Sequence, residues 1–436
     1  MIAAPATSFH CRTPALLDIV KYFAYYGLVP TRRSRPARLA RIGLRLAACA
    51  TAALGVLLGA LWLEHRTPLT LPALTGSYAV GRTTYVWTDS HQIDELSPSA
   101  EKRTVLVWIW YPSAASAAGP SADYLPPSWR AACARTYGVL MSDFLTRDPA
   151  VVRTHSSSDP PIAPDQPSYP VVIVRPGGGA LTTDVTSLAE DLASHGYVVV
   201  GFDAPYRSGL VVFPDGRVVV RPPAANPEDM PPAARTRLIN RLLPMWSGDA
   251  QFVADRLQRL NAAAPPEKFA GRLDMRRLGI FGHSFGGATA LQFCHDDPRC
   301  RAGIDLDGAP YGSAVRDGVN QPFLFLLSDH GDLAAPENRA VYADVASIGS
   351  RSPDGKLLLM IRGANHFSFT DQILVKSRFV IKLLQLFGGG LDPRRGIAIT
   401  RAYVHTFFDV HLQGAPPGAL DRLRREFPEV QPVSKR

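Results

Sequence analysis

LGIFGHSFGGATAL, residues 278–291, joins an apolar run to a glycine-rich turn and then to a helix-forming stretch. The turn is Gly282-His283-Ser284-Phe285-Gly286, a serine flanked at two positions by glycine. On a tight turn from a strand into a helix, such a serine exposes its hydroxyl at the carboxyl end of a sheet. An incidental glycine-rich turn is the alternative, but the strand before it and the helix after it favour a nucleophile. We therefore predict that Ser284 is a nucleophile.

Short apolar runs around this segment predict the rest of the sheet. Runs without polar interruption fit strands buried on both faces, and helical stretches between them fit crossovers of a parallel sheet. The predicted strands are Val171–Arg175, Tyr197–Phe202, Leu278–Phe281, Ala302–Leu306, Pro322–Leu327 and Lys356–Ile361. The predicted helices are Ser187–His195, Asp249–Asn261 and Phe285–His295.

Two further strands come earlier in the chain. Tyr78–Thr88 and Thr104–Tyr111 are rich in β-branched and aromatic residues, and no helix lies between them. We expect them to form an antiparallel edge. The whole pattern predicts an α/β-hydrolase fold, that is, a mostly parallel doubly wound sheet with an antiparallel N-terminal edge.

A nucleophilic serine needs a base, and in this fold the chain order is serine, acid, histidine. His366 lies in the loop Gly363–Phe367, directly after the last strong strand. That loop returns to the sheet edge where the serine is expected. An ordinary solvated histidine is the alternative. His295 and His405 fall in predicted helices, so His366 is the predicted base.

Two aspartates compete for the role of the acid. Asp307 ends the first strand after the nucleophile, and Asp329 follows the next strand, where many α/β hydrolases carry their acid. Spacing alone leaves these two equal. Asp305 falls within a strand and is expected to face the helices or the core.

The oxyanion hole needs two backbone N–H donors. Phe285, the residue after the nucleophile, is one candidate. Gly178 is the other, in the loop Pro176–Gly179 that follows a predicted strand. A phosphate-binding loop is less favoured there, because the sequence lacks the required Gly-Lys-Ser/Thr ending. No cluster of cysteine, histidine or glutamate has metal-ligand spacing, so neither a metal nor another cofactor is predicted.

The positive charge of the chain is concentrated at its start. The 436 residues carry a formal charge of +9, but residues 1–45 hold seven Arg, one Lys and one Asp. The arginines precede Leu46–Leu63, an uncharged stretch long enough to cross a membrane as a helix. Basic residues on its amino side place that side in the cytoplasm. The charge therefore predicts membrane topology rather than nucleic-acid binding.

These signals divide the chain. Residues 1–45 are a predicted basic cytoplasmic leader, 46–64 a transmembrane signal anchor, and 65–75 a linker. A cleaved signal peptide, with a secreted product, is the alternative to the anchor. The catalytic domain is expected over 76–415, outside the cytoplasm, with 205–246 as a possible cap and 416–436 as a C-terminal tail. Cys294 and Cys300 either form a disulfide there or remain two buried thiols.

Several short motifs carry a family resemblance. They are TGSYAVG (75–81), IWYP (109–112), LASHGY (192–197), FPDG (213–216), GHSFGGAT (282–289) and LDG (306–308). From about residue 70 to 415 the chain resembles the plasma-type (isoform II) platelet-activating factor acetylhydrolases, with their bacterial esterase and lipase-like relatives. The resemblance implies that Asp307 rather than Asp329 is the acid. One departure is Pro176-Gly177, which stands where the family usually has His-Gly.

The resemblance also implies a substrate class. It suggests hydrolysis of short acyl esters of lipids, of the 1-alkyl-2-acetylglycerophosphocholine type, by Ser284, His366 and Asp307. A general carboxylesterase or polyester hydrolase is an alternative. A catalytically silent, membrane-anchored binding module is another. Expected partners are thus an ester or phospholipid substrate and the membrane.

Overall fold

The computed structural model describes residues 36–114, 119–227, 230–331, 336–351, 356–386 and 390–433. The chain divides into two units, residues 1–60 and residues 61–436. The predicted basic leader lies outside the described residues as far as residue 35.

Helix α2, Pro36–His65, contains the apolar segment predicted as an anchor. Its stretch Leu39–His65 is long and apolar enough to cross a membrane, with a mean hydropathy of 2.1 in the best window. Within the described residues no other helix meets that test. Length and composition carry this assignment, and a signal sequence near the N-terminus meets the same criterion.

The second unit is built on one large sheet, which has 12 strands in the described residues. The strand order is β1-β5-β2-β3-β7-β6-β10-β11-β12-β13-β14, with β4 paired to β5. Their bounds are β1 Leu69–Thr70, β2 Ala79–Ile93, β3 Lys102–Ser113, β4 Ser121–Asp123, β5 Val152–Ser158, β6 Tyr169–Arg175, β7 Val198–Asp203, β10 Leu273–His283, β11 Cys300–Leu306, β12 Phe323–Leu327, β13 Lys356–Ile361 and β14 Val430–Pro432.

The pairing confirms the predicted fold class. Strands β7, β6, β10, β11, β12 and β13 are parallel neighbours, whereas β2 pairs antiparallel with β3, and β3 with β7. Alternate residues of β6 belong to opposite cores, Val172 and Val174 to one and Val171 and Ile173 to the other. Both faces are therefore covered, which explains why the parallel strands read as continuous apolar runs.

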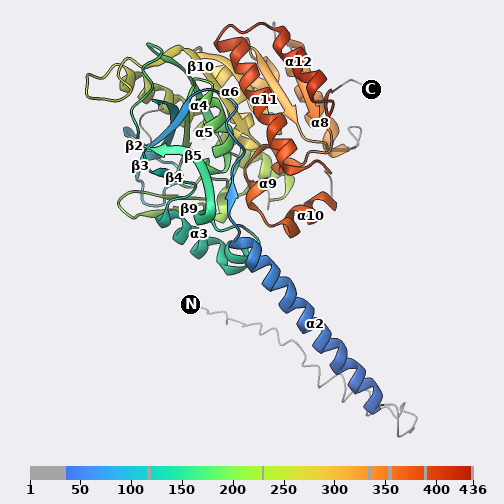
Figure 1. The fold of residues 1–436 in the computed structure, drawn as a ribbon. Helices are drawn as coiled ribbons and strands as arrows, with labels where there is room; N and C mark the ends of the chain where they lie inside the picture. The colour runs from blue at the N-terminus through green and yellow to red at the C-terminus, as the bar shows by residue number, and fades with distance from the viewer. Residues whose placement is uncertain are drawn as a thin grey trace, which may run out of the picture. The chain divides into compact units, whose positions relative to one another are not determined.

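Helices cover both faces of the sheet (Figure 1). One core contains buried residues of α3, α4, α9 and α11, and the other contains buried residues of α5, α6 and α8. The bounds are α3 Pro127–Val139, α4 Thr186–Ser194, α5 Pro232–Asn261, α6 Phe285–Asp296, α7 Ser313–Asp317, α8 Pro336–Arg351, α9 Gln372–Val375, α10 Arg378–Leu386, α11 Pro393–Leu412 and α12 Gly418–Glu426.

Two segments differ from their expected form. Much of the predicted cap, 205–246, is regular: strands β8, Leu210–Val212, and β9, Val218–Val220, form a hairpin, and α5 begins at residue 232. The predicted tail carries α12 and β14, and β14 pairs antiparallel with β13. Strand β14, only three residues long, covers the edge of the sheet at β13. The sheet therefore extends past the boundary expected at residue 415.

Candidate active site

Ser284 lies on the turn between β10 and α6. Its φ of 56° and ψ of −126° are strained values for a residue that is not glycine. The neighbouring glycines are required: a Cβ added to Gly282 would lie 2.0 Å from the carbonyl oxygen of Gly286, and one added to Gly286 would lie 2.0 Å from that of Arg175. This is the tight, strained turn that the motif predicts. The serine is half-buried and lines a cavity of about 310 Å³.

His366 and Asp307 meet at the same cavity. His366 begins the short 3₁₀ helix His366–Phe369 that follows β13, and Asp307 follows β11 with a positive φ of 56°. His366 Nδ1 lies 2.6 Å from Asp307 Oδ2. Both residues line the cavity beside Ser284. The contact orients the ring with Nδ1 toward the carboxylate, which leaves Nε2 for the hydroxyl side.

The Asp307 carboxylate is fully buried but strongly hydrogen-bonded. Its side chain has 0% exposure, and Ser328 donates to it from the backbone N–H (2.7 Å, Oδ1) and from Oγ (2.9 Å, Oδ2). Burial alone would raise the pKa of Asp307. Hydrogen bonds from His330 and His366, with the charges of both rings, instead hold that pKa well below its usual range. A permanent negative charge therefore faces His366.

Asp329 has a different environment from Asp307. Its Oδ2 accepts a hydrogen bond from the N–H of Gly363 at 2.8 Å, and its own N–H donates to the carbonyl of Ala364 at 3.0 Å. Both contacts are to the backbone of the loop that carries His366. Asp329 thus fixes that loop without touching the imidazole, and the geometry favours Asp307 as the acid.

The two candidate oxyanion donors lie beside Ser284. Phe285 is the first residue of α6, so its N–H has no acceptor within the helix. Gly178 follows Gly177, where an added Cβ would lie 2.9 Å from the Cβ of Ser284. In the described part of the chain, neither the Phe285 nor the Gly178 N–H forms a hydrogen bond, and nor does the Ser284 hydroxyl. In free enzymes such contacts often close only when substrate binds.

The ring of Phe285 packs against a buried group of aromatic and arginine side chains. It makes an edge-to-face contact with Trp246, with centroids 4.9 Å apart. The guanidinium of Arg175 lies 4.0 Å from the centroid of Trp246 and 4.6 Å from that of Phe202. Arg175 also begins the loop that leads to Gly178. Sequence patterns did not indicate this group, because its members are far apart in the chain and each reads as ordinary core.

Two further histidines lie at this site, and neither was predicted to have a role in it. His283 Nε2 lies 2.7 Å from the carbonyl oxygen of His366, and the two rings have centroids 4.4 Å apart. His330 Nε2 lies 3.0 Å from Asp307 Oδ1. His283 belongs to the turn motif itself and His330 follows a strand that ends at this edge. The sequence feature that could have identified both histidines is their position at the carboxyl ends of the parallel strands.

The family model for platelet-activating factor acetylhydrolase, isoform II, matches residues 64–212 and 245–415. The chain belongs to this family.

Individual relatives place it among carboxylic ester hydrolases. A probable 1-alkyl-2-acetylglycerophosphocholine esterase of Arthroderma benhamiae is 26% identical over 289 residues, which are 61% of this chain and 66% of that protein. A platelet-activating factor acetylhydrolase of Canis lupus familiaris is 25% identical over 364 residues, covering 78% and 77% of the two chains. The solved ferulic acid esterase of Streptomyces cinnamoneus has a TM-score of 0.70 and 30% identity, covering 84% of this chain and all of that one.

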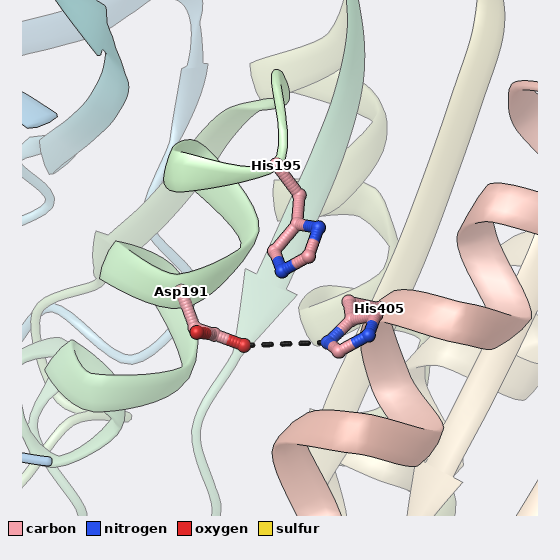
Figure 2. Close-up of side chains that lie close together, drawn as sticks. All are labelled: Asp191, His195 and His405. Atoms are coloured by element: carbon pink, nitrogen blue, oxygen red, sulfur yellow. Dashed lines mark hydrogen bonds and ion pairs between the residues drawn. The ribbon is translucent and has the colours of Figure 1, made fainter. Parts of the chain in front are cut away.

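Outside the candidate active site, this acetylhydrolase-family chain has a group of three side chains of the types that bind metal ions, where α4 meets α11 (Figure 2). One oxygen of Asp191 and ring nitrogens of His195 and His405 lie within 4.8 Å of one another. Asp191 Oδ1 already accepts hydrogen bonds from Arg401 and Thr75. The imidazoles are stacked, 4.1 Å apart and tilted by 17°, so the lone pairs in their planes do not converge on one point. The group fixes the segment before β2 rather than presenting a metal site.

Proposed function

We propose that this chain is a membrane-tethered serine esterase in which Ser284 is the nucleophile, His366 the base and Asp307 the acid. The observation that carries the proposal is the 2.6 Å contact between His366 Nδ1 and the buried Asp307 carboxylate, at a cavity that Ser284 also lines. The strained turn of Ser284 and the family membership support it.

The proposed reaction has two acyl-transfer steps. His366 Nε2 takes the proton of the Ser284 hydroxyl as its oxygen attacks the ester carbonyl, and Asp307 stabilises the imidazolium that forms. The N–H groups of Phe285 and Gly178 donate to the oxyanion. His366 returns the proton to the leaving alcohol as the ester C–O bond breaks. Water then attacks the acyl-enzyme and gives a proton to His366. His366 passes this proton to the Ser284 oxygen as the bond to the acyl group breaks, which releases the carboxylic acid and the free serine.

Short acyl esters of lipids are the proposed substrates. The cavity at Ser284 is small, about 310 Å³, and aromatic rings of Phe285, Tyr311 and Tyr342 form much of its wall. A second cavity, about 660 Å³, borders the loop that carries Gly178, because Gly179 and Leu181 line it. Its wall is largely apolar and reaches His65 at the end of α2. A small acyl pocket and a larger apolar pocket suit a lipid with one short and one long chain.

Contacts at the end of α2 support a position at the membrane surface. Within the second unit, Glu64 forms an ion pair with Arg147 and accepts a hydrogen bond from the N–H of Arg378, and His65 Nδ1 contacts the carbonyl of Thr146. The residues that follow the apolar segment are thus held against the domain. Large apolar side chains are exposed on the same elements. They are Tyr137, Val139, Leu140, Met141, Phe379 and Leu383.

We further propose that the domain lies outside the cytoplasm. The basic residues before the apolar segment and the disulfide between Cys294 and Cys300 support this topology. Because both cysteines are buried, the test is maleimide labelling during denaturing lysis of the cells, before any reduction. Both cysteines should be protected until a reductant is added, whereas labelling without reductant would place the domain in a reducing compartment.

A general carboxylesterase that accepts aromatic acyl groups is the second candidate. The likeness to the ferulic acid esterase and the aromatic wall of the cavity favour it. The full chain in detergent, assayed with p-nitrophenyl esters from acetyl to dodecanoyl and with methyl ferulate, separates the two. An optimum at acetyl supports the lipid acetylhydrolase, and preference for the ferulate supports the aromatic esterase. Ser284→Ala should abolish either, and turnover that survives this change contradicts the proposal.

A further inference from the structure

The buried Asp307 carboxylate contacts two imidazoles rather than one. His366 Nδ1 lies 2.6 Å from Oδ2, and His330 Nε2 lies 3.0 Å from Oδ1. Each ring is 41% exposed, whereas the carboxylate is fully buried. A serine triad needs only one of these contacts. The second imidazole is therefore a feature that the proposed reaction does not explain.

The end of β12 fixes this arrangement. Ser328 donates its N–H to Asp307 Oδ1 and its hydroxyl to Oδ2, and the same hydroxyl lies 3.2 Å from His330 Nε2. Both carboxylate oxygens thus have two neighbours each. A carboxylate held on every side cannot rotate to favour one imidazole, so both rings share its charge in a fixed geometry.

His330 has a position from which it can exchange protons with solvent. Its hydrogen bond to Asp307 raises the pKa of His330, although its partial burial opposes the change. The titratable groups around it are Asp307 from β11, Asp329 beside it, His366 after β13, and Arg235 of α5 and Tyr342 of α8 on the cavity wall. The negative charges of Asp307 and Asp329 both favour uptake of a proton by His330.

We propose that His330 is a positioning residue that acts through Asp307. When neutral, it donates its Nε2–H to Oδ1 and holds the carboxylate for His366. When Nδ1 takes up a proton from solvent, His330 becomes a cation that competes with the His366 imidazolium for the same negative charge. Because that imidazolium forms in the transition state, protonation of His330 slows the reaction. This inference rests on the proposed function.

The predicted consequence is a second ionisation on the acid side of the pH profile. Deprotonation of the base alone gives a logarithmic plot of kcat/KM with a limiting slope of one on the acid side, and a second protonation that slows the reaction makes the plot steeper than one over the range in which His330 titrates. The full chain in detergent is assayed with p-nitrophenyl acetate from pH 5 to 9. His330→Gln keeps a side-chain N–H donor but cannot ionise. It should give a slope of one and retain a larger fraction of its pH 8 activity at pH 5.5 than the parent.

Two further variants make the test specific. His330→Ala removes the donor as well, and kcat should fall several-fold at pH 8 while KM changes little. His295→Gln is the matched control, because His295 also contacts a carboxylate, that of Asp296 at 2.7 Å, but lies outside the cavity. It should reproduce the parent profile. A slope of one in the parent, superimposable profiles of the parent and His330→Gln, or an equal change in His295→Gln would overturn the inference.

An NMR titration of the histidine rings needs no turnover and separates this inference from the proposed function. The His330 signal, assigned by its loss in His330→Gln, should titrate above the ordinary range in the parent and at lower pH in Asp307→Asn. If the parent hydrolyses no ester, the proposed function fails, but this titration still decides whether the imidazole is coupled to Asp307. A His330 titration midpoint that is the same in the parent and in Asp307→Asn would contradict the coupling.

Discussion

His283 Nε2 lies 2.7 Å from the backbone carbonyl oxygen of His366, so the turn that carries Ser284 is connected directly to the loop that carries the His366 imidazole. The two residues are 83 positions apart in the chain. His283 is fully buried, and its Nδ1 has no hydrogen-bond partner among the described residues. A neutral ring that donates through Nε2 satisfies this geometry, whereas an imidazolium would leave a buried charge unpaired.

The burial of His283 predicts a loss of stability in weak acid. Burial, followed by the charge of His366, lowers the pKa of His283 to about 3. The unfolded chain therefore binds a proton near pH 6.5 that the folded chain refuses, so stability is complete above that pH and falls as the pH drops toward 3. Between pH 6.5 and 5 the expected loss is about 2 kcal/mol. Urea unfolding of the parent and His283→Gln measures it, and equal pH dependence in both would refute this origin.

Replacement of each candidate acid by asparagine should have very different effects on activity. Asp307→Asn removes the charge that stabilises the His366 imidazolium, and kcat should fall by roughly 10⁴-fold. Asp329→Asn keeps an acceptor for the Gly363 N–H, so kcat should change far less. Steady-state kinetics on the two variants at pH 8 decide between them. A larger loss in Asp329→Asn would transfer the role of the acid to that residue.

Gly178 allows a test of the backbone donor. A Cβ added there meets only the Arg221 guanidinium, 3.5 Å away, so Gly178→Ala should fold and keep most of its activity. Gly178→Pro removes the N–H and should lower kcat by roughly 10²- to 10³-fold. Circular dichroism checks that both variants are folded. Equal activity of the alanine and proline variants would show that this N–H is not an oxyanion donor.

Asp305, two residues before Asp307, predicts a stability change of the opposite sign to that of His283. Burial, with the charge of Asp307 beside it, raises the pKa of Asp305 well above its usual range. The folded state then holds a proton that the unfolded state releases near pH 4, so this side chain costs stability increasingly as the pH rises above 4. Asp305→Asn mimics the protonated form and should be more stable than the parent at pH 7. Thermal melts at pH 5 and 7 show whether the gain grows with pH.

Much of the sheet could be predicted because its strands are buried on both faces. Val171–Arg175 and Lys356–Ile361 carry uninterrupted apolar runs, and β6 and β13 include these residues. Strand β5 was not predicted, because THSSS within it is polar and only its burial pattern alternates. Helix α5 continues through Pro244, which normally interrupts a helix. Buried Leu243 and Trp246 on either side of the proline offset the lost hydrogen bond.

The candidate site was less predictable than the sheet. Ser284 and His366 follow from their positions after strands, and the structure brings both to one cavity. Asp307 and Asp329 could not be separated by spacing, because each follows a parallel strand and the two ends lie side by side. The contact of His330 with Asp307 depends on the exact direction of a short loop, which local sequence does not encode.

The most direct test is covalent labelling of the full chain in detergent with a fluorophosphonate, followed by intact mass measurement and peptide mapping. Such a reagent phosphonylates a serine only where a base activates its hydroxyl. We predict one adduct per chain, on Ser284, and none in Ser284→Ala, with strongly slowed labelling in His366→Gln. An adduct on another residue, or a folded parent that gains no mass, would contradict a Ser284–His366–Asp307 esterase.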